Sequence, residues 1–122
     1  DQFTRNIYRD TPQAFAGDPR ALSLAQATIA SCHHRRLPAI HQVFLFMPLE
    51  HCEDVEVQAE CLALFEELSA VTGNSEIADF TRYARAHQEV IDRFGRFPHR
   101  NALLGRESTD AEREYLQIHG GF

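Results

Sequence analysis

The chain has 122 residues, of which 43% are hydrophobic and 25% are charged, and its formal net charge is -6. This length suits one domain with a single core, and the composition is typical of soluble globular proteins. The excess of acidic residues argues against general nucleic-acid binding, which needs a broad basic surface. The longest apolar run, Val43 to Met47, is far shorter than the roughly 20 residues of a membrane span, so we expect no membrane association.

All twelve basic residues are arginines. The absence of lysine excludes Schiff-base chemistry and the lysine of a P-loop, and it leaves arginine as the permanent cation for binding an anion. The three cysteines, Cys32, Cys52 and Cys61, lack CxxC spacing. We therefore expect a reducing, cytoplasmic setting rather than a disulfide framework. The chain starts at Asp1 without a signal-peptide pattern, which suggests a trimmed or partly recorded protein.

Helical periodicity dominates the chain, and strand alternation is almost absent. We interpret Asp1 to Arg9 as the end of a helix. Asp18 and Pro19 predict the cap and first turn of the next helix. Its end is expected near His33 to Arg36, where positive charge suits the helix dipole.

The following segment, Ala39 to Met47, is apolar nearly all round and predicts a buried central helix. Pro48 is expected to end or kink this helix. Asp54 is a suitable cap for another helix, which Gly73 would end.

The clearest helical pattern runs from Ser75 to Phe94. Apolar residues recur there in steps of three and four. After this helix, Thr109 to Glu112 predicts a capping box for a last short helix, which Gly120 and Gly121 would end. Five or six helices with short connections predict an all-α domain with antiparallel neighbours. The apolar stripe comprises Ile77, Phe80, Ala84, His87, Ile91 and Phe94.

The segment His51 to Asp54 and the residue His87 are candidates for a chemical role. The segment His51 to Asp54 combines a histidine, a cysteine and two acids, but adjacent side chains diverge and no HExxH motif is present. We therefore expect no metal and no cofactor, and we favour capping acids beside a small buried cysteine. A catalytic Cys52 is the alternative, although nearby acids raise a thiol pKa. His87 is favoured as a neutral core histidine over a histidine that faces a pocket.

The segment Arg93 to Ser108 holds four arginines and a histidine and no acid before Glu107. Gly95 and Pro98 turn the backbone, so the polar side chains that follow leave a fixed point. Such turns suit the binding of carboxylate or phosphate. The alternative is that the arginines bind helix carbonyls and acids such as Glu53 or Glu107. Composition leaves the two equally favoured.

Several segments resemble the bacterial domain-of-unknown-function family 924 along the length of the chain. They are "DQFTRNIYR", "GDPRALSLA", "MPLEHCED", "GRFPHRNALLGRES" and "YLQIHGGF". The resemblance implies a tetratricopeptide-like right-handed array of helices. It also implies a further N-terminal helical part, so that this chain matches the last two thirds of a family member. It implies no established activity.

The chain departs from the family pattern at Thr4, where members read proline, and at Cys52, where they read serine. A thiol nucleophile at Cys52 is therefore not the shared mechanism. The resemblance implies that the polar segments share one site where helices turn. The candidate residues are Gln2, Arg5, Asn6, His51, Glu53, Arg96, His99, Arg100 and Asn101.

The leading functional hypothesis is a domain that binds an anionic small molecule or a peptide terminus through these arginines, histidines and asparagines. The first alternative is a hydrolase that uses His51 or His99 as acid or base, with Glu53 as the orienting partner. The second is a protein–protein interaction scaffold. RNA binding is less favoured, because the rest of the chain is acidic.

Overall fold

The computed structural model describes all 122 residues and contains seven α-helices and no strand, which confirms the all-α class. Three short 3₁₀ helices, Pro12–Phe15, His33–Arg36 and Pro98–Arg100, lie between them. The α-helices are α1 (Gln2–Ile7), α2 (Asp18–Ala30), α3 (Ala39–Glu50), α4 (Val55–Thr72), α5 (Ser75–Phe94), α6 (Asn101–Leu104) and α7 (Asp110–His119).

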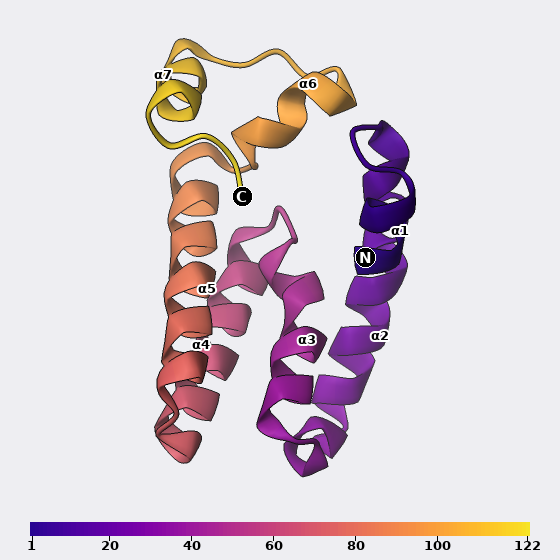
Figure 1. Ribbon diagram of the computed structural model, residues 1–122, viewed down its shortest axis with the longest axis vertical. Helices are drawn as coiled ribbons and strands as arrows, with labels where there is room; N and C mark the ends of the chain where they lie inside the picture. Colours follow the sequence, from indigo (N-terminus) through magenta and orange to yellow (C-terminus); the bar gives the residue numbers. More distant parts are fainter.

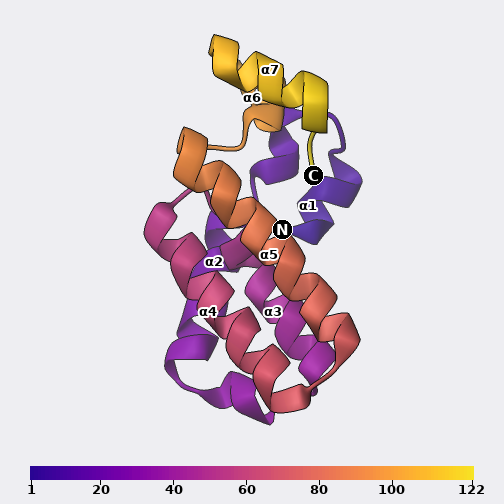
Figure 2. The ribbon, with the colours of Figure 1, turned by 90° about the vertical axis from the view of Figure 1, so that its left-hand side faces the viewer.

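Helices α2 to α5 run alternately down and up, and each packs against the next along the chain (Figure 1). The predicted antiparallel arrangement is therefore confirmed. Helices α6 and α7 lie across one end of these four helices, and α1 lies toward the same end (Figure 2). The C-terminal tail turns back from α7 toward the turn between α3 and α4. Segments from both ends of the chain thus meet at one end of the domain.

The helix ends follow local chemistry, as predicted. The Asp54 carboxylate accepts a hydrogen bond from the Val57 N–H at 3.0 Å and caps α4. Gly95 ends α5 in the left-handed region with φ of 74°, which a residue with a Cβ adopts only at a cost. The predicted capping box of α7 is present, with Thr109 and Glu112 each accepting from the backbone N–H of the other.

Three predicted boundaries differ from the structure. Gly17 rather than Asp18 is the N-cap of α2, and the Asp18 carboxylate binds Arg5 instead of a backbone N–H. Helix α2 ends at Ala30 rather than near Arg36, because Cys32 adopts a left-handed conformation with φ of 59° and a 3₁₀ turn follows. The Ser31 hydroxyl donates to the Thr28 carbonyl at 2.7 Å, which offers the backbone a local alternative to the helix. Helix α3 continues through Pro48 to Glu50, since the full burial of Leu49 holds the last turn against the core.

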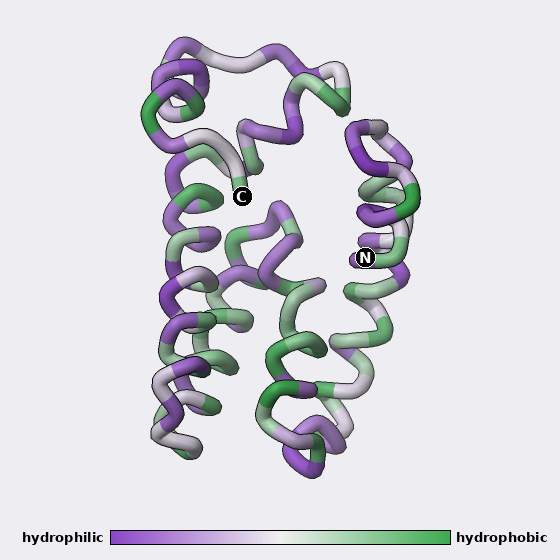
Figure 3. The backbone as a smooth tube through the Cα atoms, viewed as in Figure 1, coloured by the Kyte–Doolittle hydropathy of each residue, from purple (hydrophilic) through white to green (hydrophobic).

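The core lies between α2, α3, α4 and α5, and α3 is its most apolar element (Figure 3). The rings of Phe46 and Phe65 pack edge to face at its centre, with centroids 5.4 Å apart. Gln58 of α4 is fully buried, and its amide donates to the carbonyls of Glu50 at 2.6 Å and Cys52 at 2.8 Å. This contact fixes the turn after α3. None of the helices is long and apolar enough to cross a membrane.

Candidate functional site

A cavity of about 350 Å³ lies where α1, the end of α3, α5, the 3₁₀ helix Pro98–Arg100 and the C-terminal residue meet. Its lining combines three histidines, two arginines, one glutamine and four aromatic rings. These residues are Gln2, Arg5, Phe15, His51, Tyr83, His87, Phe97, His99, Arg100 and Phe122. Five of the nine candidate residues from the sequence line this pocket, and they come from three segments of the chain, namely residues 1–9, 47–54 and 95–108. The five are Gln2, Arg5, His51, His99 and Arg100.

The other four candidates do not line the pocket. Asn6 is exposed on α1. Arg96 binds the buried Glu112 carboxylate through two nitrogens at 2.8 and 3.0 Å. Asn101 donates to the same carboxylate at 3.2 Å and is 1% exposed. Arg96 and Asn101 therefore hold α7 in place, which is the structural alternative that the sequence had left open for this segment. Glu53, the fourth of these residues, pairs with arginines.

Glu53 pairs with arginines rather than with an imidazole. Its carboxylate accepts from Arg106 at 2.8 Å and from Arg100 at 3.4 Å. The predicted role of Glu53 as the orienting partner of His51 or His99 has no contact in the structure to support it. The acid that binds His51 is instead Asp1, whose carboxylate contacts the Nδ1 atom of the ring.

Arg100 is the central cation of the pocket. It is 7% exposed, and its guanidinium lies 4.7 Å from the ring centroid of Phe15 and 4.8 Å from that of Phe97. One terminal nitrogen donates to the His51 carbonyl at 2.9 Å. The Nε atom of Arg100 is buried and has no acceptor. The two rings thus hold a planar cation with one hydrogen-bond donor unused.

Arg5 provides the second positive charge. Its two terminal nitrogens bind both carboxylate oxygens of Asp18 at 2.5 and 2.8 Å, and its guanidinium lies over the Phe15 ring at 5.0 Å. Asp18 also lies 3.9 Å from Arg100. The carboxylates of Asp18 and Glu53 therefore offset much of the positive charge of the two arginines and fix their directions.

The three histidines are neutral at pH 7. Burial lowers the pKa of His51 to about 4, and the positive charges of Arg5 and Arg100 add to this effect. Burial likewise lowers the pKa of His87 to about 4. The pKa of His99 is also lowered to about 4, by burial first and then by Arg100. The ring nitrogens of His99 form no hydrogen bond within the protein, so they remain available to a ligand.

His87 meets both interpretations made from the sequence. It is buried and hydrogen-bonded, since its Nδ1 atom lies 2.7 Å from the Tyr83 carbonyl oxygen, and it also lines the pocket. The Phe122 ring stacks on it with centroids 3.7 Å apart.

Sequence reasoning missed Glu50 as a site residue. Its carboxylate is buried at the end of α3, 3.4 Å from the Nδ1 atom of His87. Burial raises the pKa of Glu50 to about 7. The one available signal was an acid that directly follows an apolar helix, and that position alone does not reveal a partner from α5.

Comparisons with known proteins agree with the resemblance noted from the sequence. A family model described as "Bacterial protein of unknown function (DUF924)" matches residues 1–120. The fold is similar to the solved structure of a protein of unknown function, ATU0120, from Agrobacterium tumefaciens, with a TM-score of 0.82 and 36% sequence identity. That match covers 97% of this chain and 62% of the Agrobacterium chain, so this chain spans less than two thirds of that protein. A comparison with curated proteins found no match.

Proposed function

Since the chain belongs to the bacterial protein family DUF924, whose function is unknown, we propose a function from the chemistry of its pocket. The domain binds an anionic small molecule or the carboxylate end of a peptide. The tetratricopeptide-like array implied by the family resemblance is part of this proposal, and the antiparallel order of α2 to α5 is compatible with it. A binding role needs a cavity, a cation and unused hydrogen-bond donors.

The observation that carries the proposal is the unused donor of Arg100. Arg100 lines the pocket, and its Nε–H is buried and has no acceptor. Leaving such a group unpaired costs about 1–3 kcal/mol, and most buried polar groups in proteins have partners. A carboxylate or phosphate oxygen in the cavity would be attracted by the guanidinium charge, and it would accept this hydrogen bond once a small rotation of Arg100 exposes the Nε–H. The stacked rings of Phe15 and Phe97 already hold the guanidinium in place, so little entropy is lost on binding.

Two further features favour a small anion. His99 offers a neutral ring without an internal hydrogen bond, and Arg5 lines the same pocket. The volume of about 350 Å³ falls in the range of small-molecule pockets. Because Asp18 and Glu53 offset part of the positive charge, recognition depends on directed hydrogen bonds more than on net charge.

The test is a thermal-shift screen followed by calorimetric titration. Inorganic phosphate, citrate and a short peptide with a free carboxylate are the probes. His99→Ala and Arg5→Gln should each weaken the binding of the best probe by about tenfold or more, the loss of one charge-assisted hydrogen bond. Arg113→Gln is the matched control, because Arg113 is exposed on α7. Arg100→Ala would be ambiguous, since Arg100 also supports the turn through the His51 carbonyl.

Two outcomes would contradict anion binding. Either none of the three probes stabilises the protein, or both pocket variants bind the best probe as tightly as the Arg113→Gln control does.

One observation favours a hydrolase as the second candidate. The Asp1 carboxylate binds the Nδ1 atom of His51, and a carboxylate in this position orients an imidazole that acts as general base. The arginines would then stabilise developing negative charge. Hydrolysis of a carboxylic or phosphate ester by the wild-type protein, abolished by His51→Gln, would support this candidate. Activity that survives replacement of both His51 and His99 by alanine would eliminate it.

A further inference from the structure

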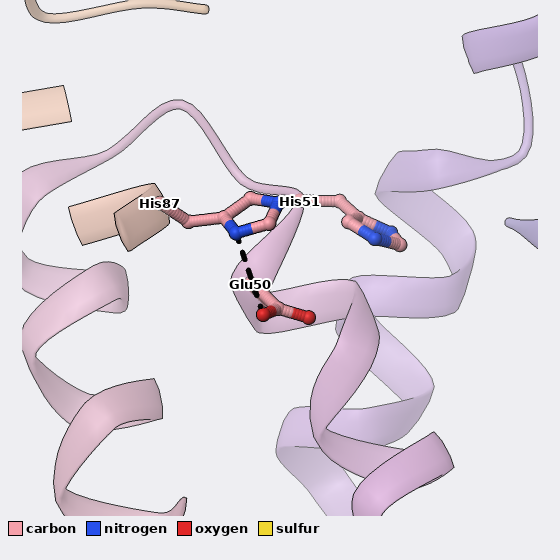
Figure 4. A group of neighbouring side chains, drawn as sticks. All are labelled: Glu50, His51 and His87. Carbon is pink, nitrogen blue, oxygen red and sulfur yellow. Dashed lines mark ion pairs between the residues drawn. The ribbon is translucent and has the colours of Figure 1, made fainter. Parts of the chain in front are cut away.

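One wall of the pocket contains two side chains of a type that binds metals, His51 and His87, and a third, Glu50, lies next to His87 without lining the cavity. Glu50 and His51 come from the end of α3, and His87 comes from α5 (Figure 4). One possible ligand atom from each residue lies within 4.8 Å of those of the other two. The side chains are 8%, 17% and 9% exposed, respectively. Neither the anion site nor the general-base candidate uses Glu50 or His87.

We propose that Glu50, His51 and His87 bind a divalent transition-metal ion. This inference goes beyond the proposed anion binding, because the three ligands are distinct from the arginines that would bind the anion. From the sequence we expect no metal in the segment His51 to Asp54. The proposed site is a different one, because Glu50 and His87 lie outside that segment.

The hydrogen bonds of the two histidines orient them for metal binding. The Nδ1 atom of His87 lies 2.7 Å from the Tyr83 carbonyl oxygen, which can only accept, so Nδ1 carries the proton and Nε2 the lone pair. The Nδ1 atom of His51 contacts the Asp1 carboxylate, which has the same effect on that ring. Metal-binding histidines almost always donate their other N–H to a carbonyl or a carboxylate in this way. In Figure 4 the second ring nitrogen of His87 lies on the side that faces His51.

The spacing of the three groups needs only a small adjustment. An ion at the centre of three atoms that lie within 4.8 Å of one another would lie no more than about 2.8 Å from each, against about 2.0–2.1 Å for a zinc–nitrogen bond. Each ligand atom would therefore move inward by up to roughly 0.7 Å, and the Glu50 carboxylate, which lies 3.4 Å from Nδ1 of His87, would rotate toward Nε2 of that ring. Three protein ligands beside a cavity leave a coordination position open for water or a ligand, as in catalytic rather than structural zinc sites.

The ligand types indicate which metals fit. Two imidazoles and one carboxylate suit Zn²⁺ or Fe²⁺, whereas Ca²⁺ and Mg²⁺ prefer oxygen ligands alone. The buried Glu50 carboxylate has no arginine partner, and a metal ion would supply the missing positive charge. Arg5 and Arg100 are paired with Asp18 and Glu53, which reduces their repulsion of a cation. The rings of Phe97 and Phe122 pack against His87 and shield this wall from water.

The experiment is a metal titration of the chelator-treated protein in buffer without phosphate. Calorimetry with Zn²⁺ should give one equivalent. One equivalent of Co²⁺ should give the visible absorption of a four- or five-coordinate ion. Glu50→Gln and His87→Gln should each weaken Zn²⁺ binding by about 100-fold or more, and Asp1→Asn, which removes the carboxylate that orients His51, by about 10–100-fold. His41→Gln is the control, because His41 is exposed on the same helix as Glu50.

Each outcome decides the matter. If the wild-type protein gives no visible Co²⁺ absorption at one equivalent, the proposal is overturned whether or not the variants fold. Zn²⁺ binding that is unchanged in both Glu50→Gln and His87→Gln overturns it as well, since the ion then binds elsewhere. Tighter binding of Fe²⁺ than of Zn²⁺ in an anaerobic titration would support the site and assign iron to it. Because the metal titration contains no phosphate, its failure would not affect the test of anion binding. A failed test of anion binding would likewise not affect the metal titration.

Discussion

Replacing Glu112 by glutamine tests whether Arg96 stabilises the fold rather than binding a ligand. Glu112 is 2% exposed and accepts hydrogen bonds from Arg96, Asn101 and the Thr109 N–H. Glutamine at this position still completes a capping box, so the Thr109 contact survives. The substitution therefore removes mainly the charge that pairs with Arg96.

The expected magnitude follows from the pKa of Glu112. The hydrogen bond from Arg96, followed by those from Thr109 and Asn101, lowers this pKa from 4.5 to about 2. Since one pKa step is worth about 1.4 kcal/mol, the ionised carboxylate contributes about 3 kcal/mol at pH 7. A pKa that is depressed in the folded state stabilises the protein above pH 4.5, and this stabilisation is lost as the pH falls toward 2. At pH 3 roughly 1.5 kcal/mol should remain.

Urea unfolding of the wild type and of Glu112→Gln at pH 7 and pH 3 measures these values. The difference between the two proteins should shrink by about half at the lower pH. Glu114→Gln is the matched control, because Glu114 is exposed on the same helix and should change stability by less than about 0.5 kcal/mol. If Glu112→Gln is as stable as Glu114→Gln at pH 7, Arg96 does not stabilise the fold, and it is again a candidate for ligand binding.

Two further predictions concern a turn and the thiols. Gly95→Ala should destabilise the domain by about 1–2 kcal/mol, because φ is 74° there, and an unchanged urea midpoint would show that this turn relaxes without cost. In thiol labelling of the native protein Cys32, which is exposed, should react first. Cys61 should react only on unfolding, because burial raises its thiol pKa; equal rates for the two would contradict the packing of α4 against α3.

The helices could be predicted from sequence wherever their ends depend on local chemistry. Asp54 as a cap and Gly95 as a stop act through their own backbone neighbours, so the pattern alone identifies them. The end of α2 could not be predicted, because Cys32 adopts a positive φ without being glycine or asparagine. The course of α3 through Pro48 depends on the burial of Leu49 by other helices, which no local signal encodes.

The candidate site could be predicted only in part, for a related reason. Polar residues at helix ends, such as Arg5 and Arg100, lie together as expected, because helix ends of this domain meet at one side. Arg96 has a structural role and Arg100 lines the pocket because Glu112 of α7 binds Arg96. The position of Glu112 depends on tertiary packing, which the sequence does not show. Glu50 acquires its environment from His87 of α5, a contact between helices that a single sequence does not reveal.

The contacts of Gln58 determine how ligand binding at the pocket would change the stability of the domain. Its amide ties the Glu50 and Cys52 carbonyls to the inside of the core, so the backbone that carries Glu50 and His51 cannot open without disturbing α4. The pocket wall and the core therefore belong to one cooperative unit, whose amides should exchange with solvent by global rather than local opening. A ligand bound at this wall would stabilise the whole domain by RT ln(1 + L/Kd) at a free ligand concentration L, so the shift of the unfolding midpoint at a known ligand concentration would give its affinity.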